Sequence, residues 1–172
     1  MNPDHGKIVS EFLLHSIESE IPRTTSVFAA LPADRLDHKP DELSKTALGL
    51  MRHIALEDVY FLEGIAAGQF GPLPDDSDGC GLMNPQDCVA QYSARMTAAI
   101  GALRALSGED LVKDLTFMGA WQMPAIQFLA MAAHHSIHHR GQLTTYIRAM
   151  GGKVPSIYGP SADTAIAAAA GA

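Results

Sequence analysis

Apolar residues recur at helical spacing in four segments of this 172-residue chain, and this period is the main constraint on its fold. The segments run over about residues 4–29, from Ser44 or Thr46 to about Ala67, over about 86–106 and over about 124–150. We find no sustained alternation of β-branched and polar residues, and no internal repeat. Four amphipathic helices of about 20 to 26 residues are what a four-helix bundle requires. The sequence therefore predicts an all-α fold, a four-helix bundle.

A long connection separates the second and third predicted helices. The segment from Gly68 to Pro85 is rich in glycine, proline and aspartate, a composition that favours a connection over a helix. Its length permits an overhand crossing, so the order of the helices in space stays open. We expect a single domain over residues 1–163, followed by an alanine-rich tail over residues 164–172 that is frayed or forms a short extra helix.

The charge of the chain argues against two classes of partner. Twelve Lys and Arg against nineteen Asp and Glu give a net charge of −7, which is a poor match for nucleic acid. Polar residues interrupt every apolar stretch before it reaches the length of a membrane span, and the first residues show no signal-peptide pattern. We therefore expect a cytoplasmic protein that binds neither nucleic acid nor a membrane. Cys80 and Cys88 are expected to be ordinary free thiols.

Eight histidines are the unusual feature of the composition. The fourth helix contains two histidine pairs at a spacing of four, His134 with His138 and His135 with His139, and either can chelate a metal from one helical face. At about 100° per residue, His135 and His139 fall on the apolar stripe that includes Phe128, whereas the other pair falls on the polar side. We therefore predict that His135 and His139 point into the bundle.

The second helix supplies a third inward histidine. His53 shares a face with Leu50, Glu57 and Tyr60 at spacings of three and four. Buried imidazoles are costly unless they are hydrogen-bonded or bind a metal. Three histidines from two helices suit Zn²⁺, Ni²⁺, Fe²⁺ or Cu²⁺ and leave at least one coordination position for water or substrate. A hydrogen-bonded histidine cluster without metal is the alternative.

Two polar residues near these histidines are candidate catalytic groups. Glu57 suits a fourth ligand, an acceptor for an imidazole N–H, a general base or a carboxylate at the surface edge, and we favour the acceptor. Gln142 falls on the histidine face of the fourth helix and can hydrogen-bond in the pocket. Arg140 falls about 120° away and is expected at a helix boundary beside a carboxylate or carbonyl. Trp121 is expected to be core or pocket wall.

The histidine segments resemble a known family. The second helix carries its inward histidine within residues 50–55, and the fourth carries His-Ser-Ile-His-His-Arg-Gly-Gln-Leu over residues 135–143. Together with the closing segment 146–155, they resemble the DinB-like (DinB/YfiT) superfamily of bacterial four-helix-bundle metalloproteins, from the first helix to about residue 163. The resemblance implies a metal triad at His53, His135 and His139, the same three residues that helical geometry selects. It also implies a homodimer and no DNA chemistry.

The resemblance further implies a class of reaction. Several relatives are thiol S-transferases or thiol-dependent isomerases, in which a divalent metal binds the sulfur of a small thiol. Our first hypothesis is therefore a metal-dependent transferase with a small-molecule substrate, in which Glu57 or Gln142 orients a ligand or accepts a proton. A metal-dependent hydrolase and a non-catalytic metal-binding or sensing bundle are the alternatives. The physiological metal (zinc, nickel or iron) and the thiol (glutathione, bacillithiol or mycothiol) stay open.

Overall fold

Four long helices make up most of the chain, which a computed structural model describes over residues 1–170. The predicted mostly helical fold is confirmed, and residues 171–172 of the expected tail lie outside the described residues. The elements, in chain order, are α1 (Pro3–Ala29), α2 (Ala47–Ala67), the 3₁₀ turn η1 (Asp78–Cys80), α3 (Pro85–Arg104), α4 (Gly108–Val112), β1 (Asp114–Phe117), β2 (Trp121–Pro124), α5 (Ala125–Ala149) and α6 (Ala162–Ala170).

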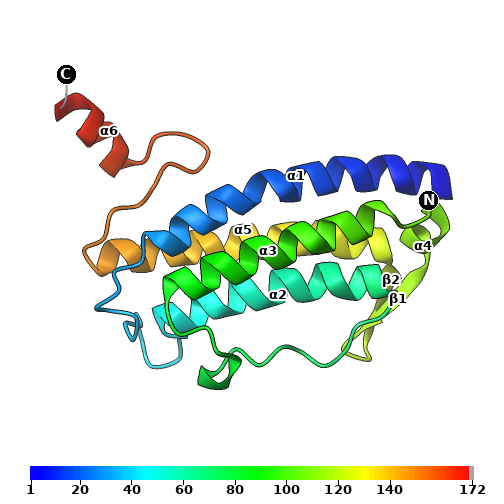
Figure 1. Ribbon diagram of the computed structural model, residues 1–172, viewed down its shortest axis with the longest axis horizontal. Coiled ribbons are helices and arrows are strands. Elements are labelled where there is room, and N and C mark those ends of the chain that lie inside the picture. The colour runs from blue at the N-terminus through cyan, green and yellow to red at the C-terminus, as the bar shows by residue number, and fades with distance from the viewer. Residues whose placement is uncertain (171–172) are drawn as a thin grey trace.

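The long helices lie side by side in two pairs of opposite direction (Figure 1). Helices α1 and α5 run one way, and α2 and α3 run the other way. Helix α1 packs on α3 and α5, and α2 packs on the same two helices. Because α2 and α3 are parallel, the connection between them returns along the length of the helices, so the crossing that the sequence left open is an overhand one.

The ends of α2 and α3 follow from local chemistry. Thr46 caps the N-terminus of α2, where its hydroxyl accepts a hydrogen bond from the backbone N–H of Gly49. Gly68 ends the helix with φ +70°, a conformation that glycine adopts without strain. Asn84 caps α3, and Pro85 occupies its first turn. Because α2 begins after Thr46, His53 lies in its second turn.

The segment between α3 and α5 differs from the loop that the sequence predicts. It forms α4 and an antiparallel hairpin in which Phe117 pairs with Trp121. Each strand has four residues, too few to show a recognisable alternation, and the turn uses Met118 and Gly119 at positive φ. Trp121 is 56% exposed, so its predicted place in the core or a pocket wall is wrong.

The connection between α2 and α3 is tied down along α2. The buried guanidinium of Arg52 contacts the Asp78 carboxylate at 2.6 Å and donates a hydrogen bond to the carbonyl of Leu82 at 2.6 Å. The Tyr60 hydroxyl donates to the carbonyl of Gly71 at 2.7 Å. These anchors hold the connection beside the helix turn that carries His53.

Two further sequence expectations can be compared with the structure. Among residues 1–170, no helix combines the length and the apolar character needed to cross a bilayer. Cys80 and Cys88 are both free, as expected.

An aromatic cluster packs behind the candidate metal centre. Its members are Tyr60, Phe61, Phe70, Phe117 and Phe128, and the Phe61 ring lies 5.7 Å from the ring of His135. Phe70 reaches this cluster by lying directly against Gly64 of α2, where a Cβ atom would overlap its ring. The cluster is the apolar wall on one side of the histidines.

We expect Gly64→Ala to destabilise the protein by about 1–3 kcal/mol, because the added methyl group displaces the Phe70 ring from the cluster. Gly101→Ala, in the exposed last turn of α3 with open space around it, is the matched control and is expected to stabilise the protein by up to about 1 kcal/mol. Urea denaturation of both variants measures the difference. Equal stabilities of the two variants would contradict this view of the Gly64–Phe70 contact.

Candidate metal centre

Three half-buried histidines converge between α2 and α5. His53 comes from α2, and His135 and His139 come from successive turns of α5. One ring nitrogen of each lies within 4.8 Å of the other two, and the Nε2 atoms of His53 and His135 are 3.3 Å apart. His134 and His138 are exposed, as the helical geometry predicts. The structure therefore brings together the three histidines that the sequence selects.

The two histidines of α5 each have an acceptor at the outer ring nitrogen. His139 Nδ1 lies 2.7 Å from Gln142 Oε1, and His135 Nδ1 lies 3.2 Å from Asp58 Oδ1. Because amide and carboxylate oxygens accept hydrogen bonds, each Nδ1 acts as the donor. In its neutral form, each of these rings then carries its lone pair on Nε2, which is the tautomer that binds metal.

Asp58 is a residue of the centre that helical geometry missed. Its side chain is almost fully buried, and its second oxygen accepts a hydrogen bond of 3.0 Å from the Tyr92 hydroxyl. Asp58 lies about 100° around the helix from Glu57, away from the His53 face on which the search was based. The sequence does contain a signal for this residue, because the Asp58 carboxylate interrupts an otherwise apolar row that includes Ile54 and Phe61 on α2.

Glu57 reaches two histidines at once. Its Oε1 lies 3.1 Å from His53 Nδ1, and its Oε2 lies 3.4 Å from His135 Nε2, the inward-facing nitrogen. Asp76, from the connection between α2 and α3, also approaches His53 Nδ1 at 3.3 Å and pairs with Lys45 at 2.6 Å. His53 Nδ1 is buried and, among the described residues, has no hydrogen bond of good geometry. The His53 ring is therefore the least firmly held of the three.

The carboxylates and imidazoles of the centre shift one another's ionisation. Burial lowers the pKa of His135, but its contacts with Asp58 and Glu57 outweigh burial and raise the pKa to about 9. Burial raises the pKa of Glu57, but His135 and His53 outweigh it and lower the pKa to about 2. Burial, together with the charges of the neighbouring rings, lowers the pKa of His139. The centre therefore holds an ionised carboxylate next to a strongly basic imidazole.

Arg140 corrects one expectation from the sequence. It lies in the middle of α5 rather than at a helix boundary, and it is only 1% exposed. Its Nη1 lies 2.6 Å from a Glu20 carboxylate oxygen of α1 and donates to Thr24 at 3.2 Å, and its Nη2 donates to the Tyr158 hydroxyl at 2.6 Å. The expected carboxylate partner is present. Helix α5 is also buried on a second face, against α1, and the apolar stripe in its sequence does not predict this face.

A solvent-accessible pocket opens beside the histidines. Its volume is about 210 Å³, and it is lined by Ser44, Lys45, Leu50, His53, His139, Gln142 and Tyr146. His53 and His139 therefore line a pocket that a small molecule can enter from solvent.

Comparison with known proteins places the chain in a family. Residues 4–167 match the DinB family. The chain belongs to the DinB family. It is 28% identical over 149 residues to the uncharacterized protein YjoA of Bacillus subtilis strain 168, which covers 85% of this chain and 90% of YjoA. A second relative from the same strain, YrdA, is 36% identical over 73 residues, or 42% of this chain and 43% of YrdA.

Two crystal structures of DinB-like proteins resemble this fold. The B. subtilis YjoA structure has a TM-score of 0.67 at 21% identity and covers 86% of this chain and 99% of that chain. A DinB-like protein from Bacillus cereus ATCC 10987 has a TM-score of 0.69 at 26% identity, over 86% of this chain and 97% of that chain. The family predicted from the histidine segments is therefore confirmed.

The ionisation of His135 predicts how stability depends on pH in the metal-free protein. The folded pKa of about 9 lies above the usual 6.5, so the stabilising contribution of protonated His135 is complete below pH 6.5 and is lost as the pH rises through 9. Because the ring is partly exposed, we expect the free energy of unfolding to fall by on the order of 1–2 kcal/mol over this range.

Urea denaturation of the chelator-treated protein at pH 6.5 and 9 measures this change. His135→Gln is expected to lose most of the fall, whereas His138→Gln, which alters an exposed neighbour, is expected to keep it. A wild-type protein that is equally stable at both pH values would contradict the prediction.

Proposed function

We propose that this DinB-family protein binds one divalent metal ion through His53, His135 and His139 and acts as a metal-dependent transferase on a small thiol. The observation that carries the proposal is the convergence of three imidazoles between α2 and α5, with the Nδ1 atoms of the two α5 rings held by acceptors, which leaves Nε2 for a metal. Without a metal, the 3.3 Å approach of the Nε2 atoms of His53 and His135 needs a proton between them, which His135 carries below its pKa of about 9.

The donor set fits a divalent metal. Nitrogen ligands at about 2.0–2.1 Å in tetrahedral geometry lie about 3.3 Å from one another. The Nε2 atoms of His53 and His135 have this separation of 3.3 Å. Imidazole ligands suit zinc, nickel and iron, so the donor set does not select among them. Three protein ligands also leave a position for a substrate, which is typical of catalytic sites.

The chemistry of the centre suits activation of a thiol. A divalent cation with three neutral ligands keeps its charge and lowers the pKa of a thiol or water molecule that it binds. Glu57 is ionised, and its Oε2 lies beside the inward nitrogen of His135, where it can accept the thiol proton. The sulfur then forms a bond to an electrophilic carbon, and the leaving group departs with the electron pair of the broken bond.

Gln142 has a different role from Glu57 in this proposal. Its Oε1 holds His139 Nδ1 at 2.7 Å, and its side chain also lines the open pocket. We assign it as a positioning residue for His139 that also contacts the substrate. The pocket beside it, of about 210 Å³, suits a small molecule rather than a macromolecule.

The position of Glu57 also supports a second candidate, a metal-dependent hydrolase. A carboxylate that accepts a proton from a thiol at this place can equally accept one from water. The two candidates share the metal and differ in the nucleophile, so a reaction with and without added thiol separates them.

We also propose that the protein works in the cytoplasm and as a homodimer. Its two free cysteines agree with a reducing compartment. The dimer is an implication of the resemblance to the family.

Metal content tests the centre directly. We expect untagged protein, purified without chelating resin, to contain about one divalent metal ion per chain by elemental mass spectrometry, and His139→Ala to lose it. His138→Ala is the matched control, because it removes an exposed imidazole next to the centre and should keep the metal. Failure of the wild-type protein to bind zinc, nickel or iron on reconstitution would refute the proposal.

Thiol transfer tests the reaction. We expect metal-loaded protein to couple a low-molecular-weight thiol, screened as glutathione, bacillithiol and mycothiol, to an electrophile. Glu57→Gln should lower kcat by at least about 100-fold, because the proton acceptor is lost. Glu63→Gln, which alters an exposed carboxylate two turns along α2, should leave kcat unchanged. A protein that binds metal but accepts neither thiol nor hydrolysable substrates would instead be a non-catalytic metal-binding bundle.

A further inference from the structure

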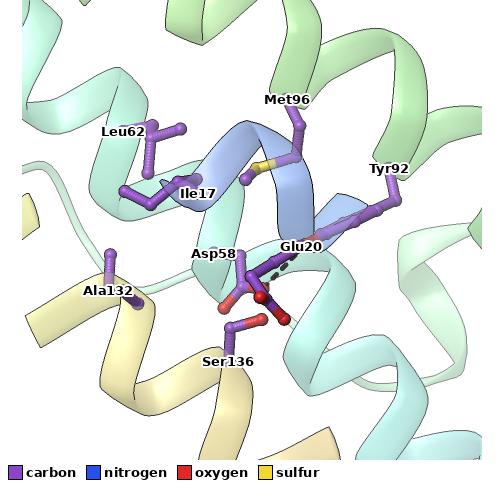
Figure 2. A pocket seen from close by; sticks show the side chains of 9 residues that line it. Ile17, Glu20, Asp58, Leu62, Tyr92, Met96, Ala132 and Ser136 are labelled. Atoms are coloured by element: carbon purple, nitrogen blue, oxygen red, sulfur yellow. Dashed lines mark hydrogen bonds between the residues drawn. The ribbon is translucent and has the colours of Figure 1, made fainter. Parts of the chain in front are cut away.

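The two histidines of α5 have supports that belong to the long helices. Asp58 of α2, the acceptor for His135, is itself held by the hydroxyl of Tyr92 on α3, which donates to it at 3.0 Å (Figure 2). The acceptor for His139 comes from α5 itself. His53 differs from both, because the long connection between α2 and α3 also reaches its ring.

Asp76 is the residue of the connection that reaches His53. Its Oδ2 lies 3.3 Å from His53 Nδ1, and the Lys45 ammonium lies 2.6 Å from the same oxygen. A carboxylate oxygen has two lone pairs, so Oδ2 can accept from both groups. Lys45 is held in turn, because its carbonyl accepts a hydrogen bond of 3.3 Å from the Tyr146 hydroxyl of α5. A chain of contacts therefore runs from α5 through Lys45 and Asp76 to His53.

The connection is fixed on both sides of Asp76. It is anchored to α2 through the carbonyl of Gly71 before this residue and through the side chain of Asp78 after it. Between these anchors, Asp75 Oδ1 accepts a hydrogen bond of 2.9 Å from the backbone N–H of Ser77, which closes a tight turn. Asp76 lies at the centre of this turn and is therefore held beside α2.

Building on the proposed function, in which His53 binds the metal, we propose that Asp76 is a positioning residue for His53. Its carboxylate accepts the hydrogen bond of His53 Nδ1–H when Nε2 binds the metal. With the proton on Nδ1, the lone pair of the neutral ring is on Nε2, as in the two rings of α5. Asp76 is not itself a ligand, because the ligand atoms that lie within 4.8 Å of one another among residues 1–170 come from the three histidines.

Glu57 is the other carboxylate that approaches His53 Nδ1, at 3.1 Å. The two carboxylates compete for this nitrogen, because an imidazole nitrogen carries a single proton to donate. The second oxygen of Glu57 lies 3.4 Å from His135 Nε2, where it is proposed to take a proton from the substrate. Once Glu57 accepts that proton, it becomes a poorer acceptor for His53. Asp76, whose charge is compensated by Lys45, holds the ring while Glu57 serves in proton transfer.

The contact between Asp76 and His53 couples the connection to the metal. Loss of an acceptor that supports a metal-bound histidine lowers metal affinity by about 10–100-fold. Linkage between two equilibria is reciprocal. The factor by which the docked connection raises the metal affinity is therefore also the factor by which the metal favours docking of the connection on α2.

Zinc affinity, measured by competition with a chromophoric chelator, tests the role of Asp76. We expect Asp76→Ala to weaken zinc binding by at least about 10-fold. Asp75→Ala is the matched control, because it removes the same charge from the same turn, where its carboxylate contacts Ser77, and it should keep the wild-type affinity. Asp76→Asn retains an acceptor oxygen, as Gln142 does for His139, and should recover most of the affinity.

Three results would overturn this role. Asp76→Ala would bind zinc as tightly as the wild type, or Asp75→Ala would lose as much affinity, which would identify an effect of charge or of the turn. Asp76→Asn would bind as weakly as Asp76→Ala, which would show that no hydrogen bond to His53 is involved. A wild-type protein that binds no zinc would instead refute the metal centre itself, and the role of Asp76 with it.

Hydrogen exchange measures the coupling in the connection itself. Saturating zinc should slow backbone exchange in peptides that cover residues 72–83 of the wild-type protein, by up to the factor that Asp76→Ala loses in zinc affinity. In zinc-saturated Asp76→Ala this slowing should be absent, whereas peptides of α5 that contain His135 and His139 should still be protected. Equal slowing of residues 72–83 in both proteins would overturn the proposed coupling.

Discussion

Helix α5 buries basic side chains on two of its faces, and each of them needs an acidic partner from a neighbouring helix. The packing of α1 and α2 against α5 depends on these acid–base pairs. His135 faces Asp58 of α2, and Arg140 faces Glu20 of α1. A buried charge that loses its partner costs about 3–5 kcal/mol. These pairs therefore fix both the rotation of α5 and its register against the two neighbouring helices. Apolar packing alone tolerates small shifts more readily.

The same pairs prepare the histidines to bind a cation. Asp58 and Gln142 each hold an outer ring nitrogen, so the inner nitrogens of His135 and His139 face a common point with His53. In the metal-free protein, a proton on His135, whose pKa is about 9, removes the repulsion between the lone pairs of neighbouring ring nitrogens. Metal binding must displace that proton, which couples the affinity of the centre to pH.

Much of the fold and the histidine triad could be predicted because the signals are local and repeated. The long helices are strongly periodic, and their caps at Thr46 and Gly68 act within one turn. The hairpin was missed because each of its strands has only four residues, and its pairing depends on the turn at Met118 and Gly119. Trp121 was misplaced for the same reason, since the hairpin turns it toward solvent.

The acids that support the centre show where sequence reasoning ends. The sequence by itself determined that His53, His135 and His139 point inward, because the helical period fixes which residues share a face. Only the tertiary structure decided which acids lie beside the buried basic residues. Asp58 lies beside His135, Asp76 beside His53, and Glu20 beside Arg140. Asp76 comes from an irregular connection, and Arg140 faces a helix more than a hundred residues earlier in the chain. No local period carries such information, because these contacts depend on which helices pack together and in which direction.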